Sequence, residues 1–186
     1  MYGMVNRAIE QLVVSLKGEA VWQQVCQRAG VGSEGFVAMC PYHDDVTYGL
    51  VGAVSEALSL TPEQVLQAFG EYWILYTADE GYGELMQAGG DSLREFLGNL
   101  NDMHGRVETV FPNMQLPRFS VEDVSDTEYR LHYGSERQGL APMVVGLVHG
   151  LARRFGQDVE VRQLRCRTQG HPDDVFVIVE RETVAA

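Results

Sequence analysis

The chain has 186 residues, 45% of them apolar, which is enough to bury the core of one domain or of two closely packed subdomains. Its formal net charge of −12 argues against nucleic acid or an anionic membrane as the main partner, since both attract basic surfaces. No signal peptide or membrane-length apolar run is evident, and the three cysteines are widely spaced, so we expect a reduced, cytoplasmic protein.

The first part of the chain is predicted to be helical. Apolar residues recur at helical spacing in residues 2–16 and again in residues 19–29, which end at Gly30. After a loop that contains glycines and a proline, a third helix is expected over residues 45–58. We therefore expect an N-terminal helical subdomain of about residues 1–60.

A fourth helix has a clear start signal. Thr61 is a good N-cap, Pro62 takes the first helical position, and Glu63 follows as an early acid. The continuation, residues 68–76, is rich in aromatic side chains. Such a composition fits either ordinary core or the wall of a large internal cavity.

The next predicted helix, residues 91–107, contains a histidine on its apolar face. Asp91 is the expected N-cap, and Glu95 lies near the positive end of the helix dipole. His104 lies near the middle of a stripe made by Leu93, Phe96, Leu97, Leu100 and Val107. A buried imidazole needs partners for its nitrogens, so His104 is either a core histidine bonded to a carbonyl group or a metal ligand.

After Pro117 the hydrophobic period changes from that of a helix to that of a strand. Residues 118–124 and 127–135 form a predicted hairpin, residues 139–155 a helix, and residues 158–167 and 174–181 two more strands. This order predicts an α+β fold with an antiparallel four-stranded sheet. We expect one domain over residues 1–182 and a frayed tail at 183–186.

Three hydrogen-bond donors alternate along the second predicted strand: Tyr133, Ser135 and Arg137. Residues two apart in a strand project from the same face, so the three side chains should point one way. Two hydroxyls and a guanidinium could bind one or two carboxylates, because arginine contacts carboxylates bidentately. The alternative is an ordinary polar strand face in contact with water.

Together, His104, Pro117 and Tyr133-x-Ser135-x-Arg137 resemble the motif set of the heme nitric oxide/oxygen binding (H-NOX) family. That family includes bacterial stand-alone sensors and the heme domain of soluble guanylate cyclase. The resemblance runs over nearly the whole chain, from Met1-Tyr-Gly to the closing strands. It implies a heme b held between the N-terminal helical part and the remainder.

The resemblance also implies a role for each residue of the motifs. His104 would be the proximal iron ligand, and Pro117 would press on the porphyrin. Charged propionates would be bound by Tyr133, Ser135 and Arg137. A distal pocket for the gas would be formed by Val5, Trp73, Met143 and Leu147.

The identity of the gas depends on distal hydrogen-bond donors. Oxygen-binding members of the family use a distal tyrosine, and Met143 takes that position in this chain. Because methionine cannot donate a hydrogen bond, we expect selectivity for nitric oxide, with carbon monoxide also bound. Trp73 and Tyr2 keep the alternative of an oxygen-binding heme protein open, since both carry a donor.

The expected distal residues include no titrating base, so we do not expect an enzyme. The resemblance instead implies a signal through release of His104 from the iron, received by a histidine kinase or a cyclic-dinucleotide enzyme. An oxygen carrier, a heme enzyme and a heme-free interaction module are the alternatives. A zinc site at Cys166 and His171 is rejected, because tetrahedral zinc needs four ligands and only these two lie close in sequence.

Overall fold

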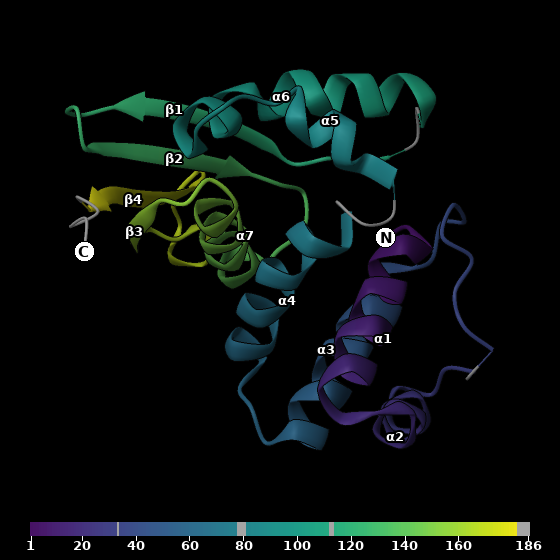
Figure 1. Cartoon of the computed structure of the whole chain (residues 1–186). Helices are drawn as coiled ribbons and strands as arrows, with labels where there is room; N and C mark the ends of the chain where they lie inside the picture. The colour runs from purple at the N-terminus through teal and green to yellow at the C-terminus, as the bar shows by residue number, and fades with distance from the viewer. Residues whose placement is uncertain (33, 78–80, 112–113, 182–186) are drawn as a thin grey trace.

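The computed structural model describes residues 1–32, 34–77, 81–111 and 114–181. Its first three helices are α1 (Gly3–Lys17), α2 (Glu19–Ala29) and α3 (Asp44–Leu58), and they gather at one end of the molecule (Figure 1). Helix α4 (Pro62–Thr77) leads from them toward the sheet. The predicted helical N-terminal part is therefore confirmed within one or two residues at each helix end.

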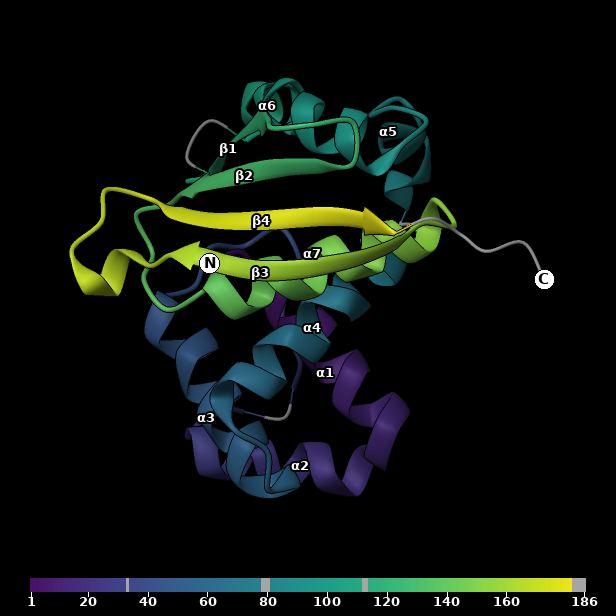
Figure 2. The same ribbon diagram turned by 90° about the vertical axis from the view of Figure 1, so that its left-hand side faces the viewer.

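A four-stranded antiparallel sheet forms the opposite end of the molecule. Its strands are β1 (Arg118–Asp123), β2 (Glu128–Gly134), β3 (Asp158–Arg165) and β4 (Asp174–Arg181), in the spatial order β1-β2-β4-β3. Helix α7 (Ala141–Arg154) lies behind this sheet in Figure 2. The predicted α+β fold with four antiparallel strands is confirmed.

The second strand is shorter than predicted. Strand β4 begins at Asp174, which pairs with Tyr133, and β1 begins at Arg118, which pairs with Gly134. Strand β2 therefore has no partner beyond Gly134. Ser135 lies in the loop that follows, so its predicted place in the strand was wrong.

Helix α6 (Leu93–Val110) contains His104, and its N-cap lies one residue later than predicted. Its N-cap is Ser92, whose hydroxyl accepts a hydrogen bond from the Glu95 backbone N–H at 3.2 Å. The Glu95 carboxylate in turn accepts from the Asp91 backbone N–H at 3.0 Å. Ser92 and Glu95 have the sequence spacing of a capping box, although the Glu95 carboxylate binds the N–H of Asp91 and not that of Ser92. The predicted Asp91 cap was therefore wrong by one residue. Short helix α5 (Gly83–Gln87) precedes α6 and was not predicted.

The start of α4 agrees with its prediction. The Thr61 hydroxyl accepts from the Gln64 backbone N–H at 3.3 Å, and the Gln64 side chain accepts from the Thr61 backbone N–H at 2.9 Å. These reciprocal bonds satisfy two N–H groups that a helix start otherwise leaves without partners.

Helices α4 and α7 cross in direct backbone contact at two glycines. A Cβ atom on Gly70 would lie 2.2 Å from the Met143 carbonyl oxygen, and one on Gly146 would lie 2.0 Å from the Gln67 carbonyl oxygen. Only glycine permits so close an approach. The crossing places Trp73 of α4 near Met143 of α7.

The apolar core consists of two clusters. One lies between the sheet, α6 and α7, and the other lies among α1, α2, α3 and α4. Trp73 packs against both clusters. No helix in the described part of the chain is both long and apolar enough to span a bilayer. The predicted single domain over residues 1–182 stays a prediction, and the predicted tail at 183–186 lies outside the described residues.

Candidate functional site

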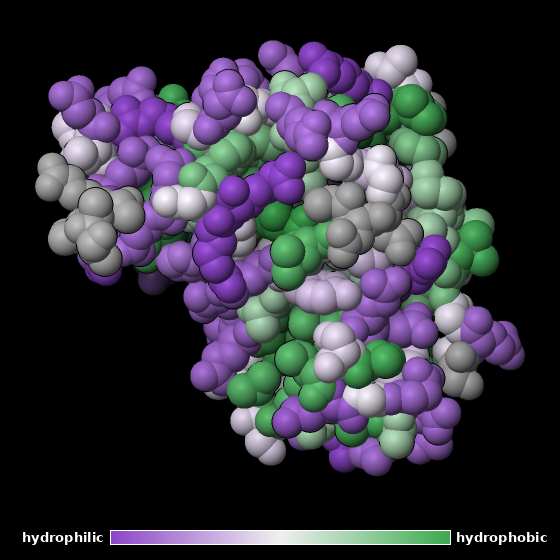
Figure 3. All heavy atoms as spheres, viewed as in Figure 1, coloured by the Kyte–Doolittle hydropathy of each residue, from purple (hydrophilic) through white to green (hydrophobic). Residues whose placement is uncertain are grey.

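Two adjoining cavities lie where the two core clusters meet. Their volumes are about 610 and 620 Å³, within the usual range for a cofactor site. The residues that line both include Trp73, Pro117, Met143 and Leu147. Apolar side chains are visible near the middle of the face in Figure 3, among hydrophilic ones. The aromatic segment of α4 thus contributes a cavity wall as well as core.

His104 lines the larger of these cavities. Its Nδ1 lies 3.0 Å from the Pro117 carbonyl oxygen. A carbonyl can only accept, so Nδ1 carries the proton and Nε2 has a free lone pair. Burial lowers the pKa of His104, against smaller upward effects of the Pro117 bond and Glu108. The imidazole is therefore kept neutral, which is the form that ligates a metal ion.

The backbone around Pro117 is fixed by the same helix. The Asn101 side-chain amide donates to the Phe119 carbonyl at 2.5 Å and accepts from the Phe119 N–H at 2.9 Å. The Phe119 ring lies 5.9 Å from the His104 ring and 5.3 Å from the Tyr133 ring, between centroids. Helix α6 and the start of β1 therefore hold His104 in one orientation.

Tyr133, Ser135 and Arg137 all line the smaller cavity, although only Tyr133 lies within β2. The Ser135 hydroxyl accepts from the Arg137 backbone N–H at 3.1 Å, which folds the loop back on itself. Burial raises the pKa of Tyr133, partly offset by a hydrogen bond with Ser135. The structure thus brings the three predicted donors together, by a strand end and a tight loop rather than by strand alternation.

Arg137 has an acidic partner that was not predicted from the sequence. Its Nε lies 2.9 Å from Asp44 Oδ2, and its Nη1 donates to the Gln115 carbonyl oxygen at 2.8 Å. Burial alone would raise the pKa of Asp44, but hydrogen bonds from the Met1 ammonium group and from Arg137 lower it overall. Asp44 begins α3, so this ion pair links the N-terminal helices to the loop after β2.

The predicted distal residues also lie together. Val5, Trp73, Met143 and Leu147 line the smaller cavity with Tyr2, and the last three of the predicted set share the larger cavity with His104. The Trp73 ring stacks on Tyr76 at 5.8 Å and lies 5.9 Å from Phe69. Aromatic packing therefore holds the indole at the cavity wall.

In the part of the chain that the structure describes, the remaining histidine and cysteine residues form no second metal centre. His132 pairs with Asp173 at 2.7 Å and with Glu122 at 3.3 Å, away from both cavities. Within the described residues, no three His, Cys, Asp or Glu side chains lie close enough to hold a metal ion. His104 therefore fits an iron whose other ligands come from a porphyrin, and the cation and hydroxyls at the cavity mouth fit the porphyrin's carboxylates.

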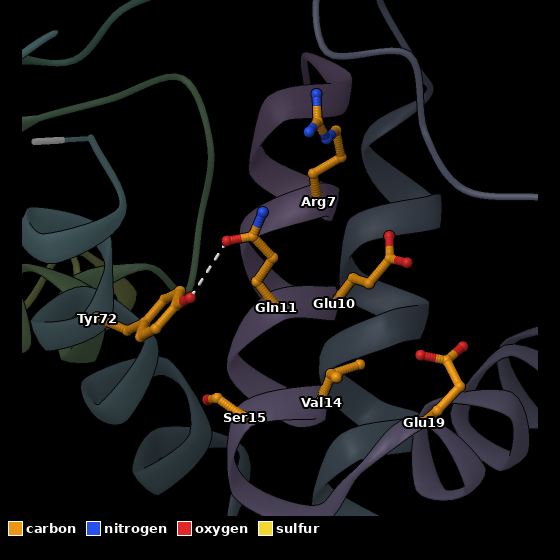
Figure 4. Close-up of a pocket in the computed structure, with 7 residues that line it drawn as sticks. All are labelled: Arg7, Glu10, Gln11, Val14, Ser15, Glu19 and Tyr72. Carbon is orange, nitrogen blue, oxygen red and sulfur yellow. Dashed lines mark hydrogen bonds between the residues drawn. The ribbon is translucent and has the colours of Figure 1, made fainter. Parts of the chain in front are cut away.

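A third pocket, of about 440 Å³, lies between α1, α2 and α4, and all its lining side chains except Val14 carry a polar group (Figure 4). There the Tyr72 hydroxyl donates to the Gln11 side chain at 3.3 Å. Burial raises the pKa of Glu10, and the nearby Glu19 carboxylate adds to this rise. None of the predicted site residues lines this pocket.

Comparison with known proteins gives matches over most of the sequence. A model of the haem-NO-binding family matches residues 2–163. The chain is 36% identical over 163 residues to soluble guanylate cyclase gcy-32 of Caenorhabditis elegans, covering 86% of this chain and 24% of that protein. It is 31% identical over 192 residues to gcy-35 of the same organism, covering 98% of this chain and 28% of that protein. The chain thus spans about a quarter of the length of these curated relatives.

Solved structures show the same fold. The chain superposes on an H-NOX protein from S. oneidensis in the Fe(II)NO ligation state with a TM-score of 0.88 and 21% identity, covering 98% of this chain and 100% of that one. For the unliganded Fe(II) H-NOX protein from K. algicida the TM-score is 0.85 and the identity 21%, with 100% of both chains covered.

Proposed function

The chain belongs to the haem-NO-binding (H-NOX) family of heme-based gas-sensing domains, and on that premise we propose that it senses nitric oxide through a heme b bound by His104. The observation that carries this proposal is the state of His104. Its Nδ1 proton is bonded to the Pro117 carbonyl, and the ring lines a cavity large enough for a cofactor. Heme iron held by one neutral imidazole can bind a diatomic gas on its other side.

At the cavity mouth, Tyr133, Ser135 and Arg137 are proposed to bind the heme propionates. Asp44 and Gln115 each engage one N–H group of the Arg137 guanidinium. Since a guanidinium carries five N–H groups, donors remain for a propionate. Charge-assisted bonds of this kind offset the cost of burying a carboxylate.

The residues proposed to surround the bound gas favour nitric oxide over oxygen. Val5, Met143 and Leu147 have no hydrogen-bond donor in their side chains. Bound oxygen is polar and is stabilised by such a donor, whereas nitric oxide and carbon monoxide bind without one. Tyr2 and Trp73 also line the smaller cavity, so oxygen binding with either of them as donor is the second candidate.

We propose that the output would begin at His104, which would hold the iron and would be released from it when the heme binds nitric oxide. Its Nδ1 bond to Pro117 can persist after release, so the ring, α6 and the Pro117 segment would move together. Pro117 lines both cavities and is proposed to press on the porphyrin until that release. A conformational signal requires such a difference in contacts between two states.

A partner protein is proposed to receive this signal, since we propose no catalytic role for the domain itself. The family resemblance supports a histidine kinase or a cyclic-dinucleotide enzyme as that partner. A cytoplasmic location is also part of the proposal, supported by the three free cysteines at Cys26, Cys40 and Cys166.

The test is the absorption spectrum of the purified, heme-loaded protein in the ferrous state, recorded alone, with nitric oxide, with carbon monoxide and in air. We expect spectral changes with both gases and no lasting oxygen complex. Met143→Tyr should raise oxygen affinity by adding a donor. A wild-type protein that holds oxygen for hours would exclude the nitric oxide assignment, and Trp73→Phe and Tyr2→Phe would then identify the donor.

A further inference from the structure

Arg167 lies directly behind the loop that carries Ser135 and Arg137. It begins the 3₁₀ helix η2 (Arg167–Gln169), between β3 and β4. Its guanidinium donates one hydrogen bond to the Ser135 carbonyl oxygen and one, at 2.8 Å, to the Arg137 carbonyl oxygen. These carbonyls belong to two of the three proposed propionate-binding residues.

Asp174 fixes the position of Arg167. Its Oδ2 lies 3.6 Å from Arg167 Nε, and its Oδ1 accepts from the Arg167 backbone N–H at 3.1 Å. The Gln163 side chain donates to the same Oδ1 at 3.0 Å. Asp174 is only 5% exposed, and a buried carboxylate requires such partners. Asp174 also pairs with Tyr133 in the sheet. It therefore contacts Tyr133 directly and is linked through Arg167 to the Ser135 and Arg137 carbonyls.

The loop needs this support because it lies beyond the end of β2. Without a neighbouring strand, the carbonyls of Ser135 and Arg137 must find donors elsewhere or remain in water. The Arg167 guanidinium binds both with one planar, rigid group. On the other side of the loop, the Tyr48 hydroxyl of α3 donates to the Gln138 carbonyl at 2.9 Å.

We propose that Arg167 is a positioning residue for propionate binding: by holding the Ser135 and Arg137 carbonyls it keeps the side chains of these two residues directed into the cavity before heme arrives. This inference rests on the proposed heme-binding function. Arg167 itself lines neither of the two adjoining cavities, so it acts through the loop and not by contact with heme.

The test compares Arg167→Met with Arg165→Met, which changes an exposed arginine two residues away. Heme-loaded ferrous protein is mixed with excess apomyoglobin, and the rate of heme transfer is measured. Arg167→Met should release heme about tenfold faster than wild type, and Arg165→Met at the wild-type rate. In an Arg137→Ala background the Arg167→Met effect should become smaller, because the part of it that acts through the Arg137 side chain is lost and only the part that acts through Ser135 remains.

The inference predicts that Arg167→Met does not change the release rate of heme dimethyl ester, because this ester has no charged propionates. A purely structural role predicts instead that Arg167→Met accelerates the release of heme and of its dimethyl ester equally. Arg167→Lys keeps the charge but not the planar fork and should lie between the two, which also provides a test if Arg167→Met does not fold.

Wild-type release rates for heme from both Arg167 variants would overturn the inference and leave the proposed function intact. Equal acceleration for heme and its dimethyl ester would overturn it as well. Failure of the wild-type protein to take up heme through His104 would instead exclude the proposed function, and the inference with it.

Discussion

His104 is a partly buried imidazole whose two nitrogens are used differently. Nδ1 is bonded to the Pro117 carbonyl, which leaves Nε2 free for the proposed iron. We expect His104→Gly to abolish heme retention or to leave a heme that dissolved imidazole restores, because the glycine opens a space of imidazole size. Heme content and the ferrous spectrum measure this.

The matched control is His149→Gly, since His149 also lies in a helix but lines neither of the two adjoining cavities. Both changes place glycine in a helix, with a similar helix-propensity cost of less than about 1 kcal/mol. A normal ferrous spectrum in His104→Gly would remove this residue as the ligand.

His132 should make stability depend on pH. Its hydrogen bond with Asp173 raises its pKa, against burial and with a further rise from Glu122. A histidine whose pKa is higher in the folded state adds stability below the unfolded-state pKa of about 6.5, and that contribution disappears as pH rises through the folded-state pKa.

We therefore expect His132→Gln to lower the free energy of unfolding by about 1 kcal/mol near pH 5.5 and by less near pH 9. Urea unfolding of the heme-free protein at the two pH values measures this difference. An equal loss at both would show that the charge on His132 contributes nothing.

At the scale of elements, the contact between α4 and α7 depends on two glycines, Gly70 and Gly146, which have no side chain. Gly146→Ala should reduce the free energy of unfolding by about 1 to 3 kcal/mol, because the added methyl group meets the Gln67 backbone. Chemical denaturation gives the value.

Gly52→Ala in α3 is the control, since a Cβ atom there meets nothing within 4 Å. It should stabilise by up to about 1 kcal/mol through helix propensity. If both alanine variants were equally stable, close helix packing at Gly146 would be refuted.

The elements themselves were largely predictable from periodicity and turn residues. Helix α2 and strand β4 have the bounds that the sequence predicts. Errors arose where a boundary depends on a partner in space. The spacing of Tyr133, Ser135 and Arg137 suggests a strand that continues past Gly134, but the neighbouring strands do not extend that far, so Ser135 and Arg137 fall outside β2.

The residues that line the candidate site could be named from the sequence, but the residues that hold them in place could not. His104 and the Tyr133 motif were recognisable from spacing together with a family resemblance. Asp44 lies 93 residues from Arg137, and Arg167 lies 30 residues after it. Single charged residues in separate segments give no local pattern that would pair them.

At the scale of the whole molecule, the cavities receive residues from both core clusters. Heme in this position would contact α1 through Val5 and α6 through His104. Since a ligand that binds only the folded state stabilises it, we expect heme at 100 times its dissociation constant to add about 2.7 kcal/mol to the stability.

We also expect one cooperative transition, in agreement with the single domain predicted from the sequence. Thermal unfolding followed by far-ultraviolet circular dichroism and by the heme absorption band should then coincide. Heme loss well below the melting of the helices would contradict this and indicate two separately folding parts.

The backbone contact between α4 and α7 has a further consequence for molecular size. Helices that already touch at Gly70 and Gly146 cannot move closer, and the neighbouring aromatic stack fixes the Trp73 ring. Among the proposed distal side chains, Met143 can yield most room to a larger ligand, because it has three rotatable bonds. The pocket should bind two-atom gases readily. Its affinity for bulkier ligands, such as alkyl isocyanides of increasing length, should fall once the ligand exceeds the space that rotation of the Met143 side chain provides.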